Sequence, residues 1–181
     1  MSNIDFLNLS GANLPISDLL GKPVEVCIVS RDYRQTMIGL TSLGIMPWRV
    51  YTFDPQTVTA GTFRGHPADY SMKVCFAGSG DLTWEIIQPL SGPTIFAEHL
   101  EQHGEGLHHL AFDCNDLPWE DRIAAFEKLG FAVIQSGKWM DQNAFAFFGT
   151  EEATGTIFET YEFPPGFIFP EPEEWYPRPP E

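Results

Sequence analysis

The chain has 181 residues, of which 43% are hydrophobic and 14% aromatic, and its formal net charge is −15. This length fits one domain, or two small modules that share a core. The acidic balance disfavours nucleic acids and anionic membranes as partners, because both select a basic surface. No run approaches the roughly 18 apolar residues of a membrane span, and the first residues lack the basic and apolar regions of a signal peptide. We therefore expect a cytoplasmic globular protein.

The three cysteines, Cys27, Cys75 and Cys114, each lie in an apolar run and show no Cys-x-x-Cys spacing. An odd number without that spacing disfavours a disulfide framework and a thiolate zinc site. We expect them to be buried strand residues in a reducing compartment.

The first half of the chain alternates strand and helix patterns. Its β-branched and alternating stretches predict strands at 24–30, 48–53, 70–76 and 82–88. Helical spacing of apolar residues predicts a helix over 33–43, which Gly44 ends. The Gly-, Pro- and Thr-containing segment 54–69 is predicted to be a loop, and a short helix is expected from about residue 93 to residue 103.

The second half repeats this order. Strands are predicted at 110–114, 131–135, 144–148 and 156–163, with a helix over 119–129 that Gly130 ends. Both halves therefore have the order β-α-β-β-β, which indicates an internal repeat. The predicted organisation is a lead-in (1–21), a first module (22–92), a connecting helix (93–106), a second module (107–164) and a C-terminal arm (165–181).

The two halves also align residue by residue. EVCIVSRD, which starts at Glu25, aligns with HLAFDCND, which starts at His109, and TWEIIQP aligns with IFETYEFP. The alignment pairs Glu25 with His109, and Glu85 with Glu159. We interpret it as an internal duplication.

These four positions form a candidate metal site. A charged side chain in the middle of an apolar strand is costly to bury without a partner. Three carboxylates and one imidazole on a concave sheet would repel one another unless a cation lay among them, and oxygen ligands with one nitrogen suit a divalent ion. The alternative is that the glutamates point outward from half-exposed strands, with Glu25 paired to Lys22. His108 is expected to face the opposite side from His109, because strand side chains alternate.

The tandem units, with GLHHLAF opening the second and WEIIQPL and FETYEFP closing each half, resemble the vicinal oxygen chelate superfamily. This superfamily includes glyoxalase I, methylmalonyl-CoA epimerase, bleomycin resistance proteins and extradiol dioxygenases. The resemblance covers about residues 24–164. It implies an α+β fold in which two β-α-β-β-β modules form a curved mixed sheet around a cavity, with helices on the convex side. It also implies a homodimer, since family members often dimerise.

The resemblance implies four metal ligands at Glu25, Glu85, His109 and Glu159. Histidine is the usual residue where Glu25 stands, so an extradiol iron site is not expected. The implied cofactor is one divalent ion, with Mn, Mg, Fe, Co, Ni and Zn as candidates. The implied chemistry is removal of a proton next to a carbonyl, with Glu159 or Glu85 as the base, as in an isomerase or epimerase. A lyase acting on a thiol adduct, an enzyme of a small aromatic metabolite and a metal-free binding protein are the alternatives.

The cavity is expected to take a small carbonyl or carboxylate substrate with an apolar body. In PWRVYTF, Arg49, Tyr51 and Phe53 share one face of a strand, and Lys73 is expected to reach the same space. The alternative is that the aromatic residues are core and the bases lie at strand ends. The second half supplies an equivalent aromatic wall from Phe145, Phe147 and Phe148.

The arm holds seven prolines from residue 164 onward, interleaved with aromatic residues. So many prolines exclude a helix or a central strand. We expect an extended segment that packs on a surface, a second chain's surface being one candidate.

Overall fold

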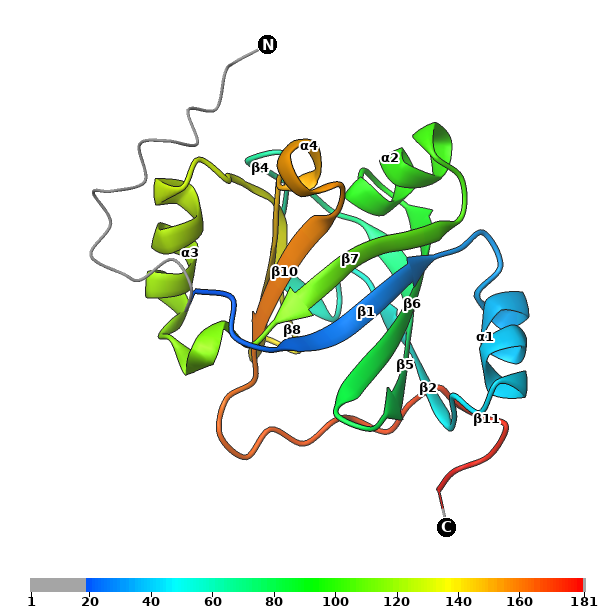
Figure 1. The fold of residues 1–181 in the computed structure, drawn as a ribbon. Coiled ribbons are helices and arrows are strands. Elements are labelled where there is room, and N and C mark those ends of the chain that lie inside the picture. Colours follow the sequence, from blue (N-terminus) through cyan, green and yellow to red (C-terminus); the bar gives the residue numbers. More distant parts are fainter. Residues whose placement is uncertain (1–18, 181) are drawn as a thin grey trace.

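The computed structural model describes residues 19–180, so most of the expected lead-in lies outside the described residues. One curved mixed sheet of 11 strands forms the centre of the molecule, in the order β11-β2-β5-β6-β1-β7-β10-β9-β8-β3-β4 (Figure 1). The strands are β1 (Pro23–Val29), β2 (Trp48–Phe53), β3 (Val58–Phe63), β4 (His66–Pro67), β5 (Ser71–Ser79), β6 (Leu82–Ser91), β7 (Gly106–Phe112), β8 (Val133–Trp139), β9 (Asn143–Phe148), β10 (Ile157–Glu162) and β11 (Glu174–Tyr176). The helices are α1 (Tyr33–Ser42), α2 (Ile95–Gln102), α3 (Trp119–Lys128) and α4 (Glu151–Thr154). The α+β class predicted from the sequence is confirmed.

Two helices cover the convex face of the sheet, one for each half. Met37 of α1 packs in a buried cluster with Trp48 and Val50 of β2. Phe126 of α3 stacks on Phe148 of β9, with ring centres 3.8 Å apart. The opposite, concave face carries the largest buried cluster. No helix among the described residues is long and apolar enough to cross a membrane.

Strand pairing shows the internal repeat directly. Strands β1 and β7 lie side by side and antiparallel, β1 pairs in parallel with β6, and β7 pairs in parallel with β10. Cys27 of β1 lies opposite Glu85, and Ala111 of β7 lies opposite Glu159. The repeat alignment makes Cys27 and Ala111 equivalent, so the two halves pair their strands in the same register, as an internal duplication requires.

The predicted loop over 54–69 is wrong, because it contains β3 and β4. Strand β3 pairs with β8, so a hairpin of the first half completes the edge of the second half. The register of β3 against β8 shifts between Thr59 and Thr62, so the side chains of β3 do not alternate regularly and the sequence shows no strand pattern. Gly61 lies in this irregularity, where a Cβ would come 2.7 Å from the carbonyl oxygen of Ala68.

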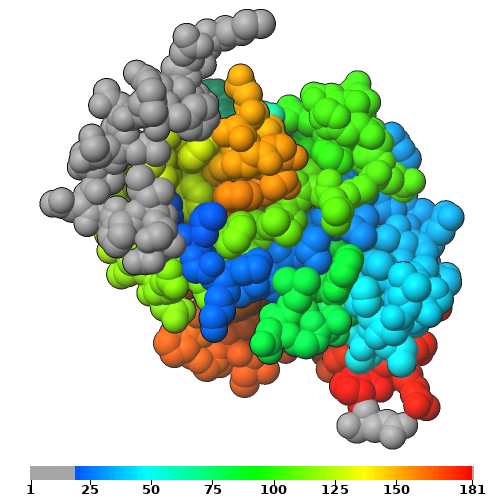
Figure 2. Space-filling view, viewed as in Figure 1, coloured from blue at the N-terminus to red at the C-terminus, as the bar shows by residue number. Residues whose placement is uncertain are grey.

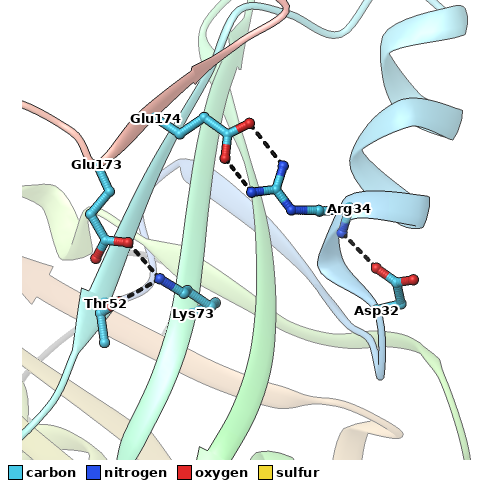
Figure 3. Close-up of polar contacts among 6 residues, drawn as sticks. All are labelled: Asp32, Arg34, Thr52, Lys73, Glu173 and Glu174. Carbon is cyan, nitrogen blue, oxygen red and sulfur yellow. Dashed lines mark hydrogen bonds and ion pairs between the residues drawn. The ribbon is translucent and has the colours of Figure 1, made fainter.

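The C-terminal arm packs on its own chain. It leaves β10 and passes below the sheet in Figure 1 to reach β2, where β11 pairs antiparallel with that strand. Figure 2 shows the arm, orange to red, along the lower border of the molecule. Two ion pairs hold its end, Arg34 with Glu174 and Lys73 with Glu173 (Figure 3).

Candidate active site

The four residues of the candidate metal site come from the four adjacent central strands β6, β1, β7 and β10. One nitrogen of His109 and one carboxylate oxygen each of Glu25, Glu85 and Glu159 all lie within 4.8 Å of one another. All four side chains are buried. The alternative that the glutamates point outward from half-exposed strands, with Glu25 paired to Lys22, is therefore excluded.

The facing atoms in this cluster lack hydrogen-bond partners. The Nε2 atom of His109 lies 3.1 Å from an Oε2 atom of Glu85 and 3.1 Å from that of Glu159. None of these three atoms has a hydrogen-bond partner in the described chain. Ligands about 2.0–2.2 Å from a common ion lie roughly 3 Å or a little more from their neighbours. The spacing and the donor types fit a divalent cation with oxygen and nitrogen ligands.

The electrostatics of the cluster also favour a cation. Burial, with the charges of Glu85 and Glu159 beside it, raises the pKa of Glu25 well above its usual range. Burial raises the pKa of Glu159 to about 7. Burial lowers the pKa of His109, but Glu159 and Glu85 outweigh it and raise that pKa to about 9. These carboxylates therefore need a positive charge beside them in order to be ionised together.

The prediction that His108 faces away from His109 is wrong. Opposite β1, His109 pairs with Cys27 and Leu107 pairs with Ile28, so His108 is the extra residue of a β-bulge. A bulge breaks the alternation of side chains. Both imidazoles are buried, and their Nδ1 atoms form a hydrogen bond of 2.8 Å.

The sequence analysis did not assign Cys27 to this site. Its sulfur, an oxygen of Glu85 and a nitrogen of His109 lie within 4.8 Å of one another. The available signal was spacing, because Cys27 follows Glu25 by two residues on one strand and shares its face. Burial raises the pKa of the thiol well above its usual range, and the charge of Glu85 and a hydrogen bond to it add to the effect.

A cavity of about 80 Å³ lies over Glu25, Glu85 and Glu159. The predicted residues that line it are Arg49, Phe53, Phe145 and Phe147. Phe148 lies on the convex face instead, against Phe126. Further lining residues that the sequence analysis did not assign are Met72, Phe76, Thr83, Ile87, Trp139, Asn143, Tyr161, Phe163 and Phe169.

The two predicted bases have different positions. Arg49 lines the cavity, and its guanidinium lies 4.3 Å from the centre of the Phe169 ring. It forms no ion pair with a carboxylate of the described residues. Lys73 does not line the cavity, so that prediction is wrong: its register partner is Thr52, and its ammonium group donates to Thr52 and Glu173 (Figure 3).

Tyr51 lies behind the cavity wall rather than in it. Its hydroxyl donates to the carbonyl oxygen of Pro170, 3.1 Å away, and its ring packs on Trp139. It therefore fixes the arm to β2 instead of facing the space over the glutamates.

Comparison with known proteins assigns the family. Residues 25–147 match the model of the Glyoxalase/Bleomycin resistance protein/Dioxygenase superfamily, and the chain belongs to this superfamily. The uncharacterized protein YqjC of Bacillus subtilis is 29% identical over 96 residues, which cover 52% of this chain and 67% of YqjC.

Similar solved structures include methylmalonyl-CoA epimerases. That of Mycobacterium tuberculosis superposes with a TM-score of 0.60 at 14% identity, over 84% of this chain and 95% of the epimerase. A Streptomyces coelicolor methylmalonyl-CoA epimerase variant in complex with 2-nitronate-propionyl-CoA gives a TM-score of 0.54 at 16% identity, over 78% and 94%. At these identities the likeness establishes the shared fold alone.

Proposed function

We propose that this protein is a metal-dependent isomerase or epimerase that removes a proton next to a carbonyl group. The observation that carries the proposal is the buried cluster of Glu25, Glu85, His109 and Glu159 at the floor of the cavity. Two of its carboxylates, Glu85 and Glu159, come from equivalent strands of the repeat. Strands β6 and β10 flank β1 and β7 in the sheet, and both carboxylates line the cavity, so two carboxylates are available to a reaction that exchanges a proton at one carbon.

The proposed ligands are Glu25, Glu85, His109 and Glu159, and the candidate ions are Mn, Mg, Fe, Co, Ni and Zn. A divalent ion bound there would stabilise negative charge that develops on a substrate oxygen. Three ionised carboxylates carry one more negative charge than a divalent ion neutralises. Hard oxygen donors with one imidazole disfavour ions that prefer thiolates.

Glu159 is the proposed base. The C–H bond next to the carbonyl breaks, the proton moves to the carboxylate of Glu159, and the bonding electrons move toward the carbonyl oxygen. Glu85 relays a proton from water to the opposite face of the carbon, which completes an epimerisation. Glu159 then returns the abstracted proton to water, so the proton count of the site is restored.

The proposed substrate is a small carbonyl compound or carboxylate with an apolar body. Arg49 offers a guanidinium without a carboxylate partner among the described residues, and aromatic rings make up much of the surrounding wall. The similar epimerases are named for a CoA substrate. The −15 charge of this chain argues against a polyanionic CoA ester as its own substrate.

The first experiment is the metal content of the purified chain by mass spectrometry. We expect about one divalent ion per chain in the wild type and in the control Glu152→Gln, which removes an exposed carboxylate. We expect the ion to be lost in Glu25→Ala and His109→Ala. A wild-type chain that takes up none of the six candidate ions would overturn the proposal, and the cavity would then be that of a metal-free binding protein.

The second experiment tests the chemistry. The metal-loaded chain is incubated in D₂O with methylmalonyl thioesters and small aromatic 2-oxo acids, and loss of the proton next to the carbonyl is followed by proton NMR. We expect exchange with the wild type and none with Glu159→Gln, whose fold is checked by circular dichroism. Exchange at the wild-type rate in Glu159→Gln would eliminate it as the base.

A further inference from the structure

We propose that His108 is a positioning residue, which fixes the ring orientation and the tautomer of His109 so that the Nε2 lone pair of His109 faces the three glutamates. The inference rests on the proposed function, because it takes His109 as a metal ligand. It assigns a role to the first histidine of the pair, for which neither the repeat nor the metal cluster accounts.

The β-bulge makes the contact possible. In a regular strand, the side chains of two successive residues point to opposite faces and cannot meet. Here His108 is the extra residue between the pairs of Leu107 and His109, and the two Nδ1 atoms lie 2.8 Å apart. Among the described residues, the His109 ring forms its hydrogen bond through Nδ1 to His108, and its Nε2 atom has no hydrogen-bond partner.

Proton arithmetic then sets the direction of the bond. One of two facing nitrogens must carry hydrogen and the other must present a lone pair. A metal ligand needs the lone pair of Nε2, so the hydrogen of a neutral His109 is on Nδ1 and is donated to Nδ1 of His108. Metal-binding histidines generally donate their second N–H to a carboxylate, a carbonyl or water. In this chain the acceptor is a second imidazole.

His108 is itself held in place. It is 3% exposed, and its ring packs on Phe96, at 5.0 Å between ring centres, and edge-on against His99, at 4.9 Å. As the acceptor at Nδ1 it carries its hydrogen on Nε2, which is buried and has no hydrogen-bond partner among the described residues. The residue lines a polar pocket of about 290 Å³ beside α2, separate from the cavity over the glutamates. A buried side chain that packs against two other rings can impose its orientation on its neighbour.

Two substitutions of His108 separate positioning from packing. His108→Asn keeps an acceptor near the place of Nδ1, because the amide oxygen is the same number of bonds from the backbone. His108→Leu keeps most of the volume and removes the acceptor. The matched control is His66→Leu, which removes an exposed imidazole from β4, at the edge of the sheet.

The measurement is the dissociation constant of Mn²⁺ and of Co²⁺ for the full-length, metal-stripped chain, with circular dichroism as a check of the fold. Loss of a hydrogen-bond partner of a metal ligand typically costs about 10- to 100-fold in metal affinity. We expect His108→Leu to weaken binding by about that factor. We expect His108→Asn to stay within about threefold of the wild type, and His66→Leu not to differ from it.

A spectroscopic readout accompanies the affinities. In the Zn²⁺-loaded chain, the Nδ1 proton of His109 should give an exchange-protected ¹H–¹⁵N signal in the wild type and in His108→Asn. That signal should be lost by exchange in His108→Leu.

Each outcome decides between the two proposals. Wild-type affinity in His108→Leu, or a larger loss in His108→Asn than in His108→Leu, overturns the positioning role while the metal site stands. A wild-type chain that binds no ion overturns the metal-dependent function, and the inference that rests on it fails for that separate reason.

Discussion

The guanidinium of Arg49 lies 4.3 Å from the centre of the Phe169 ring, which joins strand β2 to the C-terminal arm beside the cavity. Such a cation–π contact stabilises a partly exposed site by roughly 0.5–1 kcal/mol. Phe169 also packs on Trp139, with ring centres 6.0 Å apart, and both rings line the cavity. The arm is therefore a structural part of the cavity wall.

Shortening Phe169 should destabilise the protein. Replacing a fully buried phenylalanine by alanine typically costs about 3–5 kcal/mol in stability. Phe169 is only half-buried, so a smaller cost is expected. We expect Phe169→Ala to lower the free energy of unfolding in urea by about 1–2 kcal/mol. The neighbouring Ile168 is 85% exposed, so Ile168→Ala should stay within about 0.5 kcal/mol of the wild type. Equal effects of the two substitutions would mean that the arm does not pack on the cavity in solution.

The sequence predicted the architecture because the duplication repeats each strand pattern twice. Helix α1 begins at its predicted residue, where the side chain of Asp32 accepts the backbone N–H groups of Arg34 and Gln35. The alignment of the halves also brought out Glu25, Glu85, His109 and Glu159, which the fold gathers from four strands. A repeat carries long-range information that single strand patterns lack.

Three features were beyond prediction for physical reasons. A β-bulge depends on the pairing partner, so the contact between His108 and His109 is not visible in the sequence. The hairpin of β3 and β4 pairs with the other half, and Gly61 interrupts its alternation. The face on which Lys73 lies is set by the register of β5 against β2, which the sequence does not show. Its partner, Thr52, belongs to the face of β2 opposite Arg49 and Phe53, so Lys73 points away from the cavity.

Replacing Glu25 should stabilise the metal-free protein while it weakens metal binding. Glu25 is 4% exposed and faces Glu85 and Glu159, so ionising all three without a cation is costly. We expect Glu25→Gln to raise the free energy of unfolding in EDTA by an amount on the order of 1 kcal/mol. The same variant should hold less metal when the ion content is measured by mass spectrometry. Glu152→Gln, which removes an exposed carboxylate, should change neither quantity. A fall in stability in EDTA would contradict the proposed repulsion.

Arg122 should support the strand that carries Glu159. It is 5% exposed, and it donates from α3 to the carbonyl oxygens of Leu117 and Tyr161 and to the hydroxyl of Thr160. Arg122→Met would leave these acceptors without their donor, at a cost of about 2–3 kcal/mol in the free energy of unfolding.

The matched control for this change is Lys128→Met, which removes an exposed cation from the last turn of the same helix. We expect an effect within about 0.5 kcal/mol in urea unfolding. If both variants lost the same amount, the contribution of Arg122 would be its charge rather than its buried hydrogen bonds.

Gly137 and Gly39 should respond in opposite directions to alanine. A Cβ on Gly137 of β8 would come 2.6 Å from Phe145 and 2.9 Å from Val58, so the cavity wall and strand β3 would have to shift. Overpacking of this kind typically costs about 1–3 kcal/mol. Gly39 lies on the exposed side of α1 with nothing within 4 Å of an added Cβ, and alanine there should stabilise the helix by about 0.5–1 kcal/mol. Urea unfolding of both variants measures the difference. A neutral Gly137→Ala would show that β3 does not pack closely on β8, and the pairing of the first-half hairpin with the second half would have to be revised.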